Sequence, residues 1–155
     1  MTNRLSTATL PAIRTAVTPA YARADLTAGI VHFGVGNFHR AHQAVYLDAL
    51  FNLGEGHDWA LVGAGVRAAD EAMRQKLMGQ EWLTTVVEQE ADHSAAHITG
   101  AMIDYLPPGD SAAVISRLAD PAIRIVSLTI TEGGYYIDPA SQKFDPTPPD
   151  IVHDA

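Results

Sequence analysis

The chain alternates short, continuous apolar runs with longer segments in which apolar residues recur at helical spacing. Three apolar runs predict strands. The runs at 29–34 and 59–66 are typical of strands buried on both faces, and residues 123–130 form the most strand-like run in the sequence. Three segments rich in helix formers predict helices: residues 38–53, 70–78 and 110–118. Two further runs, 82–87 and 97–103, flank a polar stretch and predict either a hairpin or two successive strands.

Strands and helices alternate in this order, which predicts an α/β fold with a mostly parallel sheet of Rossmann type and flanking helices. We expect an N-terminal arm at 1–20, the Rossmann-type domain at 21–138 and a proline-rich connector at 139–155 that leads toward a further region. The sheet is expected to be incomplete within the chain. In the first predicted helix, we expect the apolar residues to form the buried side: Phe38, Ala41, Val45, Leu47, Ala49 and Leu50.

Composition narrows the class of protein. The chain has 155 residues, of which 47% are hydrophobic and 18% charged, as in a globular domain. Its 10 basic and 18 acidic residues give a net charge of −8, which argues against a nucleic-acid partner. It has no cysteine and no apolar run of membrane-spanning length. We therefore expect a cytoplasmic protein with no membrane partner and no disulfide.

The segment Gly34-Val35-Gly36-Asn37-Phe38 carries the strongest chemical signal, because it joins a buried strand to a helix. The first glycine allows a sharp turn and the second lets the backbone approach a pyrophosphate, while the following helix supplies free N–H groups. His39 replaces the third glycine of the usual fingerprint. A tight turn with close packing remains the alternative interpretation.

Asp70 is the candidate for the acid that binds the adenosine ribose. It follows the second predicted strand, 34 residues beyond Gly36, which is more than the usual separation of about 20. A role in capping the helix is the alternative. Arg67 nearby would suit a 2′-phosphate, but the acid favours NAD over NADP.

A third loop, Thr131-Glu132-Gly133, follows the last predicted strand. Loops after parallel strands share one sheet edge, so we expect it beside the glycine loop and Asp70. His39 and Arg40 are candidates for the substrate side, and Arg40 also suits a phosphate. His39 and His42 have a spacing that could bind a metal, but no third ligand supports this, and we expect none. His32 is expected to be a hydrogen-bonded core histidine.

Three stretches together resemble a known family: residues 30–48, residues 63–67 with Asp70, and residues 120–138. They are similar to the polyol-specific long-chain dehydrogenases, which transfer hydride between NAD and a polyol–ketose pair. The resemblance implies that Gly34, Gly36 and Phe38 line the pyrophosphate turn, that Asp70 selects NAD, and that Glu132 and its glycines border the nicotinamide. The family often has a second acid before the position of Asp70, where this chain has Ala69, so discrimination against NADP is expected to be softer.

The resemblance also implies what the chain lacks. Family members carry their catalytic lysine in a C-terminal helical domain, and neither Lys76 nor Lys143 matches that motif. We therefore expect no catalytic residue here, and a C-terminal domain of the same polypeptide as partner. The alternatives are a stand-alone nucleotide-binding module or an inert fragment, and, less favoured, a methyltransferase.

Overall fold

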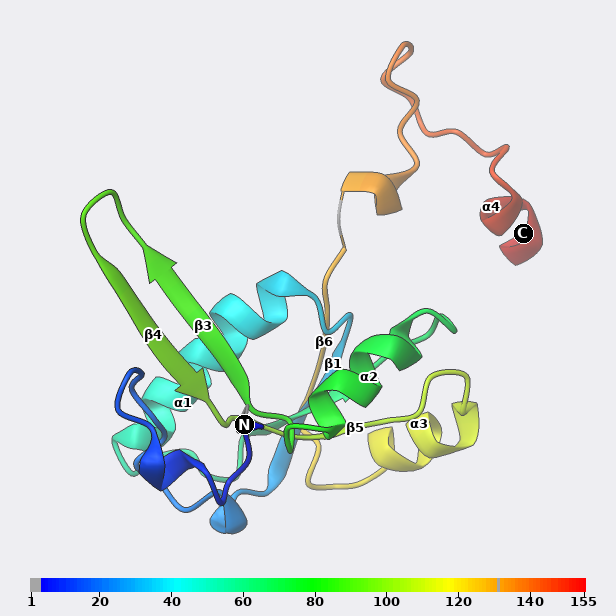
Figure 1. The fold of residues 1–155 in the computed structure, drawn as a ribbon. Helices are drawn as coiled ribbons and strands as arrows, with labels where there is room; N and C mark the ends of the chain where they lie inside the picture. Colours follow the sequence, from blue (N-terminus) through cyan, green and yellow to red (C-terminus); the bar gives the residue numbers. More distant parts are fainter. Residues whose placement is uncertain (1–3, 131) are drawn as a thin grey trace.

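The computed structural model describes residues 4–130 and 132–155. Its centre is a parallel four-stranded sheet in the order β5-β2-β1-β6 (Figure 1). The strands are β1 (Ala28–Phe33), β2 (Ala60–Ala64), β5 (Met102–Tyr105) and β6 (Ile125–Leu128). The chain runs from β1 to β2 to β5 on one side and then crosses to β6 on the other side of β1. The predicted Rossmann-type α/β fold is therefore confirmed.

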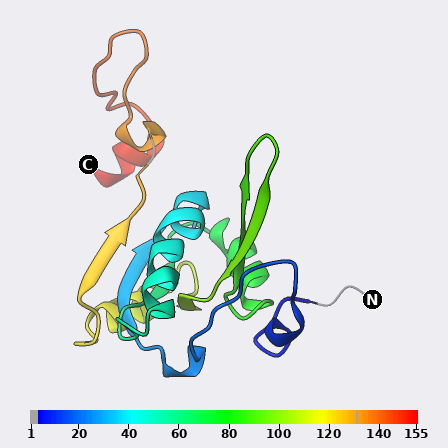
Figure 2. The same ribbon diagram turned by 90° about the vertical axis from the view of Figure 1, so that its left-hand side faces the viewer.

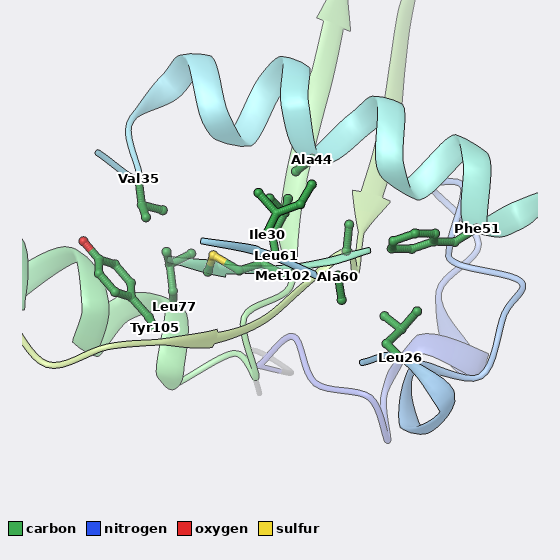
Figure 3. Close-up of a cluster of buried hydrophobic side chains, with 11 residues drawn as sticks. Leu26, Ile30, Val35, Ala44, Phe51, Ala60, Leu61, Leu77, Met102 and Tyr105 are labelled. Carbon is green, nitrogen blue, oxygen red and sulfur yellow. The ribbon is translucent and has the colours of Figure 1, made fainter. Parts of the chain in front are cut away.

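Helices cover both faces of the sheet. On one face, side chains of α1 (Ala44–Asn52) and α2 (Asp70–Met78) pack on the sheet around Ile30 and Leu61. Figure 3 shows Ala44 and Phe51 of α1 lying over this layer. On the other face, α3 (Ser111–Leu118) packs against Val31 and Val62 through Val114 and Leu118. β1 and β2 are buried on both faces, which explains their continuous apolar runs, whereas β6 at the edge is largely exposed.

The first helix contains a π-helical turn that the sequence did not indicate. The five residues of η3 (His39–Gln43) form this turn and lead directly into α1. Because a π-turn adds a residue, the buried positions are spaced as His39, Ala44, Asp48 and Phe51. The predicted buried side was therefore right only in part: Leu47 and Leu50 pack against the core, whereas the Phe38 side chain is 57% exposed. Gly54 follows the helix with φ of +80°, as expected of a glycine there.

The segment predicted as one strand at 97–103 divides between two sheets. β3 (Thr84–Gln89) and β4 (Ser94–Thr99) form an antiparallel hairpin, which confirms the hairpin alternative, and β5 joins the parallel sheet. Gly100 lies at the division, where its N–H donates to the Asp48 carboxylate at 2.7 Å. A Cβ at Gly100 would lie 2.7 Å from Cδ of Arg23, so the close approach requires glycine. The hairpin extends away from the sheet (Figures 1 and 2).

Short elements make up the two ends of the chain. η1 (Leu10–Ala12) and η2 (Arg23–Asp25) precede β1, and Val17 forms a parallel bridge with His97 of the hairpin. After β6 come η4 (Glu132–Tyr135) and α4 (Pro149–Asp154). The segment predicted as a connector, 139–155, thus contains the short helix α4. Figure 2 shows this last segment beyond the end of β6.

Candidate functional site

A groove of about 950 Å³ opens at the carboxyl ends of β1, β2 and β6. This is the edge at which ligands bind in open parallel sheets, and it includes the point where the strand order reverses, between β1 and β6. The groove brings together residues from all three predicted loops: Gly34, Arg67, Asp70, Gly133 and Gly134. Residues from three loops that lie as much as 100 positions apart in the sequence thus line one groove.

The glycine loop has the backbone geometry that a close ligand requires. Gly34 adopts φ of +93°, which a side chain disfavours, and the Gly36 N–H donates to the Gly34 carbonyl at 2.7 Å. A Cβ on Gly36 would contact only that carbonyl, at 3.9 Å, so the space above Gly36 is open. Val35 points inward and packs in the core beside Tyr105 (Figure 3). The loop therefore exposes backbone without side chains to a ligand, while the buried Val35 side chain holds the loop on the core.

Asp70 is held at the groove by its own loop. Its Oδ2 atom accepts a hydrogen bond from the Arg67 backbone N–H at 3.0 Å, and Asp70 begins α2 as a first-turn acid. A Cβ at Gly65 would lie 2.5 Å from Cβ of Asp70, so this close approach requires a glycine at the end of β2. The carboxylate is half-buried and lines the groove together with Arg67. The Arg67 N–H thus fixes Oδ2 of Asp70, while the carboxylate stays accessible from the groove.

The third loop is described only in part. Thr131 lies outside the described residues, and Glu132 is described by its backbone, as the first residue of η4. Gly133 and Gly134 line the groove opposite the loop that carries Arg67 and Asp70. The predicted position of this segment beside the other two loops therefore holds for its glycines.

The structure does not support a substrate contact by His39. Its ring is fully buried and stacks on His32, with ring centroids 4.5 Å apart. The Arg40 guanidinium folds back on the glycine loop, where it donates to the Asn37 Oδ1 atom at 2.8 Å and to the Gly36 carbonyl at 3.2 Å. His42 is exposed beside Phe38, so His39 and His42 do not face a common ligand. The difference arises from the π-turn, which rotates His39 into the interior.

Sequence reasoning missed a buried polar cluster beneath the groove. The His32 ring bonds the Ser127 hydroxyl through Nδ1 at 2.9 Å and the Thr129 hydroxyl through Nε2 at 3.0 Å. Gln43 bridges His39 Nδ1, at 3.0 Å, to the Ser127 hydroxyl, at 3.3 Å. Burial lowers the pKa of His32, and burial lowers the pKa of His39 to about 4. Both rings are therefore neutral at neutral pH.

Of the residues in this cluster, the sequence analysis predicted only His32 correctly, as a hydrogen-bonded core histidine. The available signal was Ser127 and Thr129 at alternate positions of the mostly apolar run at 123–130. A second cavity, of about 460 Å³, lies over the cluster between α1 and β6 and is lined by Phe38, His42 and Tyr46 among others.

Two features do not occur in the part of the chain that the structure describes. No helix there is both long and apolar enough to cross a bilayer. In the same residues, no three histidine, aspartate or glutamate side chains gather in a way that could hold a metal ion.

The parallel sheet, the glycine turn after β1 and the acid after β2 define a Rossmann-type domain. Residues 28–154 match the mannitol dehydrogenase Rossmann domain, and the chain belongs to this family. It is 61% identical over 143 residues to a mannitol 2-dehydrogenase of Cereibacter sphaeroides, covering 92% of this chain and 30% of that protein. A mannitol 2-dehydrogenase of Pyricularia oryzae is 46% identical, with 88% of this chain and 27% of that protein covered.

Solved structures agree with this assignment. Mannitol 2-dehydrogenase of Pseudomonas fluorescens, in a ternary complex with NAD and D-mannitol, superposes with a TM-score of 0.85 and is 47% identical. A D-sorbitol dehydrogenase in substrate-free form gives a TM-score of 0.81 at 36% identity. Each comparison covers 98% of this chain but 32% of the other. The chain thus spans about a third of the length of these proteins.

Proposed function

We propose that these residues form the cofactor-binding part of an NAD-dependent polyol dehydrogenase that interconverts a polyol and its ketose, of the mannitol–fructose type. The observation that carries the proposal is the groove at the strand-order reversal, which unites Gly34, Asp70 and Gly133. Their chemistry suits a dinucleotide: bare backbone for a pyrophosphate, a carboxylate for a ribose diol, and a glycine-rich loop on the far side. The relative crystallised with NAD and D-mannitol supports the same choice.

Each predicted residue has a distinct task in this proposal. Gly34 and Gly36 let the backbone approach the pyrophosphate, and Val35, Asn37 and Phe38 shape the turn. The Asp70 carboxylate accepts hydrogen bonds from both ribose hydroxyls and repels a 2′-phosphate, while Arg67 beside it reduces that repulsion. Thr131, Glu132 and Gly133 border the nicotinamide. Bound NAD supplies the hydride acceptor, and the chain orients it.

The proton-transfer step is proposed to use residues outside these 155. The chain has two lysines, Lys76 and Lys143, both exposed, and neither is among the residues that line the groove. We propose that a C-terminal region of the same polypeptide supplies the general base and most of the substrate pocket. We also propose a cytoplasmic role in carbohydrate metabolism, since nicotinamide cofactors and small polyols meet in that compartment.

The test is titration of the chain with NADH by calorimetry, after circular dichroism has established that it is folded. Asp70→Ala is expected to weaken NADH binding at least tenfold, because it removes charge-assisted hydrogen bonds to the ribose. Asp70→Asn keeps the acceptor for the Arg67 N–H and separates the loss of charge from loop disorder. Asp92→Ala, an exposed acid in the hairpin turn, is the matched control. A complete reading frame that folds and does not bind NADH would exclude the proposal.

The substrate class is tested on the complete reading frame. Cofactor reduction with mannitol, and NADH oxidation with fructose, are the expected activities. Binding of NADH without turnover on any polyol, ketose or uronate would favour a stand-alone nucleotide-binding module instead.

A further inference from the structure

A continuous hydrogen-bonded chain connects the buried His39 ring to Thr129 in the groove wall. It runs from His39 to Gln43, from Gln43 to Ser127, from Ser127 to His32 and from His32 to Thr129, with every step between 2.9 and 3.3 Å. Only its Thr129 end lines the groove at the strand-order reversal. The chain therefore joins the start of the first helix to the end of β6.

The amide of Gln43 gives this hydrogen-bonded chain a direction. Its Oε1 atom faces His39 and accepts from Nδ1–H, while its Nε2 atom donates to the Ser127 oxygen. Ser127 is then free to donate its own hydrogen to His32 Nδ1, which leaves the proton of the neutral His32 ring on Nε2. His32 Nε2–H consequently donates to the Thr129 oxygen. The low pKa of both rings is consistent with this neutral tautomer.

Thr129 stands at the base of the glycine loop. Its Cβ lies 3.7 Å from the point that a Cβ on Gly34 would occupy, and its N–H donates to the Phe33 carbonyl at 3.1 Å. It also lines the groove that contains Gly34 and Asp70. Because its oxygen accepts from His32, the Thr129 hydroxyl keeps its hydrogen for another acceptor.

We propose that Thr129 is a cofactor-binding residue whose hydroxyl donates to an oxygen in the pyrophosphate–ribose part of the dinucleotide, and that His32 is a positioning residue that orients this hydroxyl. The inference rests on the proposed function and adds a hydrogen-bond donor that the glycine fingerprint does not contain. Thr129 follows β6 and lies beside Gly34, whereas Asp70 follows β2 on the other side of β1, and this assigns Thr129 to the part of the ligand beyond the adenosine.

The first experiment measures NADH affinity of the folded chain by calorimetry. Thr129→Val preserves shape but removes the hydroxyl, and is expected to weaken NADH binding about tenfold. Thr129→Ser keeps the hydroxyl and should stay within about twofold of the wild type. Thr85→Val, at an exposed position of the hairpin, is the control for the same chemical change away from the groove.

Shorter ligands locate the acceptor oxygen. Thr129→Val should leave AMP binding unchanged and weaken ADP-ribose binding as much as NADH binding. If Thr129→Val weakens ADP binding equally, the acceptor lies in the pyrophosphate. If it weakens the binding of ADP-ribose and NADH but not of ADP, the acceptor lies in the second ribose. A loss of AMP affinity equal to that of NADH would overturn the inference, because the effect would then be a general disturbance of the groove.

A double-mutant cycle tests the role of His32. His32→Phe retains a flat ring that can stack on His39 but removes both ring nitrogens. It should weaken NADH binding about fivefold in the wild-type background and less than about twofold in the Thr129→Val background. Additive losses would overturn the positioning role. Thr129→Val alone decides the binding role if His32→Phe does not fold.

The outcomes separate this inference from the proposed function. If the wild-type chain binds NADH and Thr129→Val binds it equally well, the inference is wrong and the proposed function stands. If the complete reading frame folds and does not bind NADH, both are wrong.

Discussion

Gly65 and Asp70 approach each other so closely that a Cβ on the glycine would stand 2.5 Å from the Asp70 Cβ. The end of β2 and the start of α2 therefore set the position of the carboxylate jointly. Gly65→Ala must push Asp70 or the loop between them outward, at a cost of about 1–3 kcal/mol in stability. We expect Gly65→Ala to weaken NADH binding nearly as much as Asp70→Ala does. In a chain that already carries Asp70→Ala, adding Gly65→Ala should weaken NADH binding little further.

Calorimetry on the two single variants and the double variant measures this coupling. Gly54→Ala is the control, at a glycine outside the groove where an added Cβ meets nothing within 4 Å. Full NADH affinity in a folded Gly65→Ala chain would show that the observed approach does not position Asp70 for binding.

The two glycines of the turn should respond differently to alanine. Gly36 has open space around an added Cβ, so Gly36→Ala should fold with nearly unchanged stability and yet lose NADH affinity by tenfold or more, because the methyl occupies the path of the pyrophosphate. Gly34→Ala should lose about 1–2 kcal/mol of stability as well, because Gly34 has φ of +93°. Urea unfolding and NADH titration of both variants separate the effects. Normal NADH binding by Gly36→Ala would contradict the assigned ligand path.

Local patterns were sufficient for most elements. The helix predicted at 70–78 is α2, Asp70–Met78. The apolar runs at 59–66 and 123–130 contain β2 and β6, and the run at 29–34 overlaps β1, which begins one residue earlier. The glycine loop and Asp70 were placed at one sheet edge because parallel strands end together. These features depend on residues close in sequence, or on a topology rule that applies to any α/β sheet.

The polar cluster beneath the groove could not be predicted in the same way. His32 is 95 residues from Ser127 and 97 from Thr129, and the pairing depends on the register of β1 against β6. The π-turn was also invisible, because His39 and Gln43 are compatible with an ordinary helix and only the burial of His39 against His32 shows the extra residue. Long-range pairing therefore limits the prediction of a site more than local conformation does.

Asp48 joins three segments through its carboxylate. It accepts from the Tyr21 hydroxyl at 2.5 Å, from the Gly100 N–H at 2.7 Å and from Asn52 Nδ2 at 3.1 Å. Asp48→Asn places an amide N–H against one of these donors, and we expect it to lower the free energy of unfolding by about 2–4 kcal/mol. Asp25→Asn, at an exposed position in η2, should change it by less than about 0.5 kcal/mol. Urea denaturation is the measurement, and equal midpoints for the two variants would contradict this role.

Acid should destabilise the fold through His39. Its pKa is about 4 in the folded chain, mainly because of burial, against an ordinary value of 6.5. Between these two values the unfolded chain binds more protons, so the free energy of unfolding falls as pH falls from 6.5 to 4, by a total of about 3 kcal/mol. The lowered pKa of His32 acts in the same direction, whereas burial raises the pKa of Asp48 and opposes it.

Comparison with His39→Phe isolates the contribution of that ring, since the other groups titrate in both chains. The variant should lose most of the His39 part of the pH slope between pH 6.5 and 4 in urea denaturation, while His42→Phe, at an exposed position, should retain it. Identical slopes in the wild type and His39→Phe would mean that the buried ring does not govern the acid response.

The outer edge of β6 should drive self-association of the 155-residue chain. Within the described residues β6 pairs with β1 alone, and Val126 and Leu128 are 53% and 58% exposed on this strand. An unpaired apolar edge can accept another strand, so we expect the sedimentation coefficient to rise with concentration. Val126→Lys should shift the chain toward monomer, because a charge on the edge disfavours pairing. Val152→Lys in α4 changes an exposed valine away from the edge, and an equal shift there would exclude β6 as the cause.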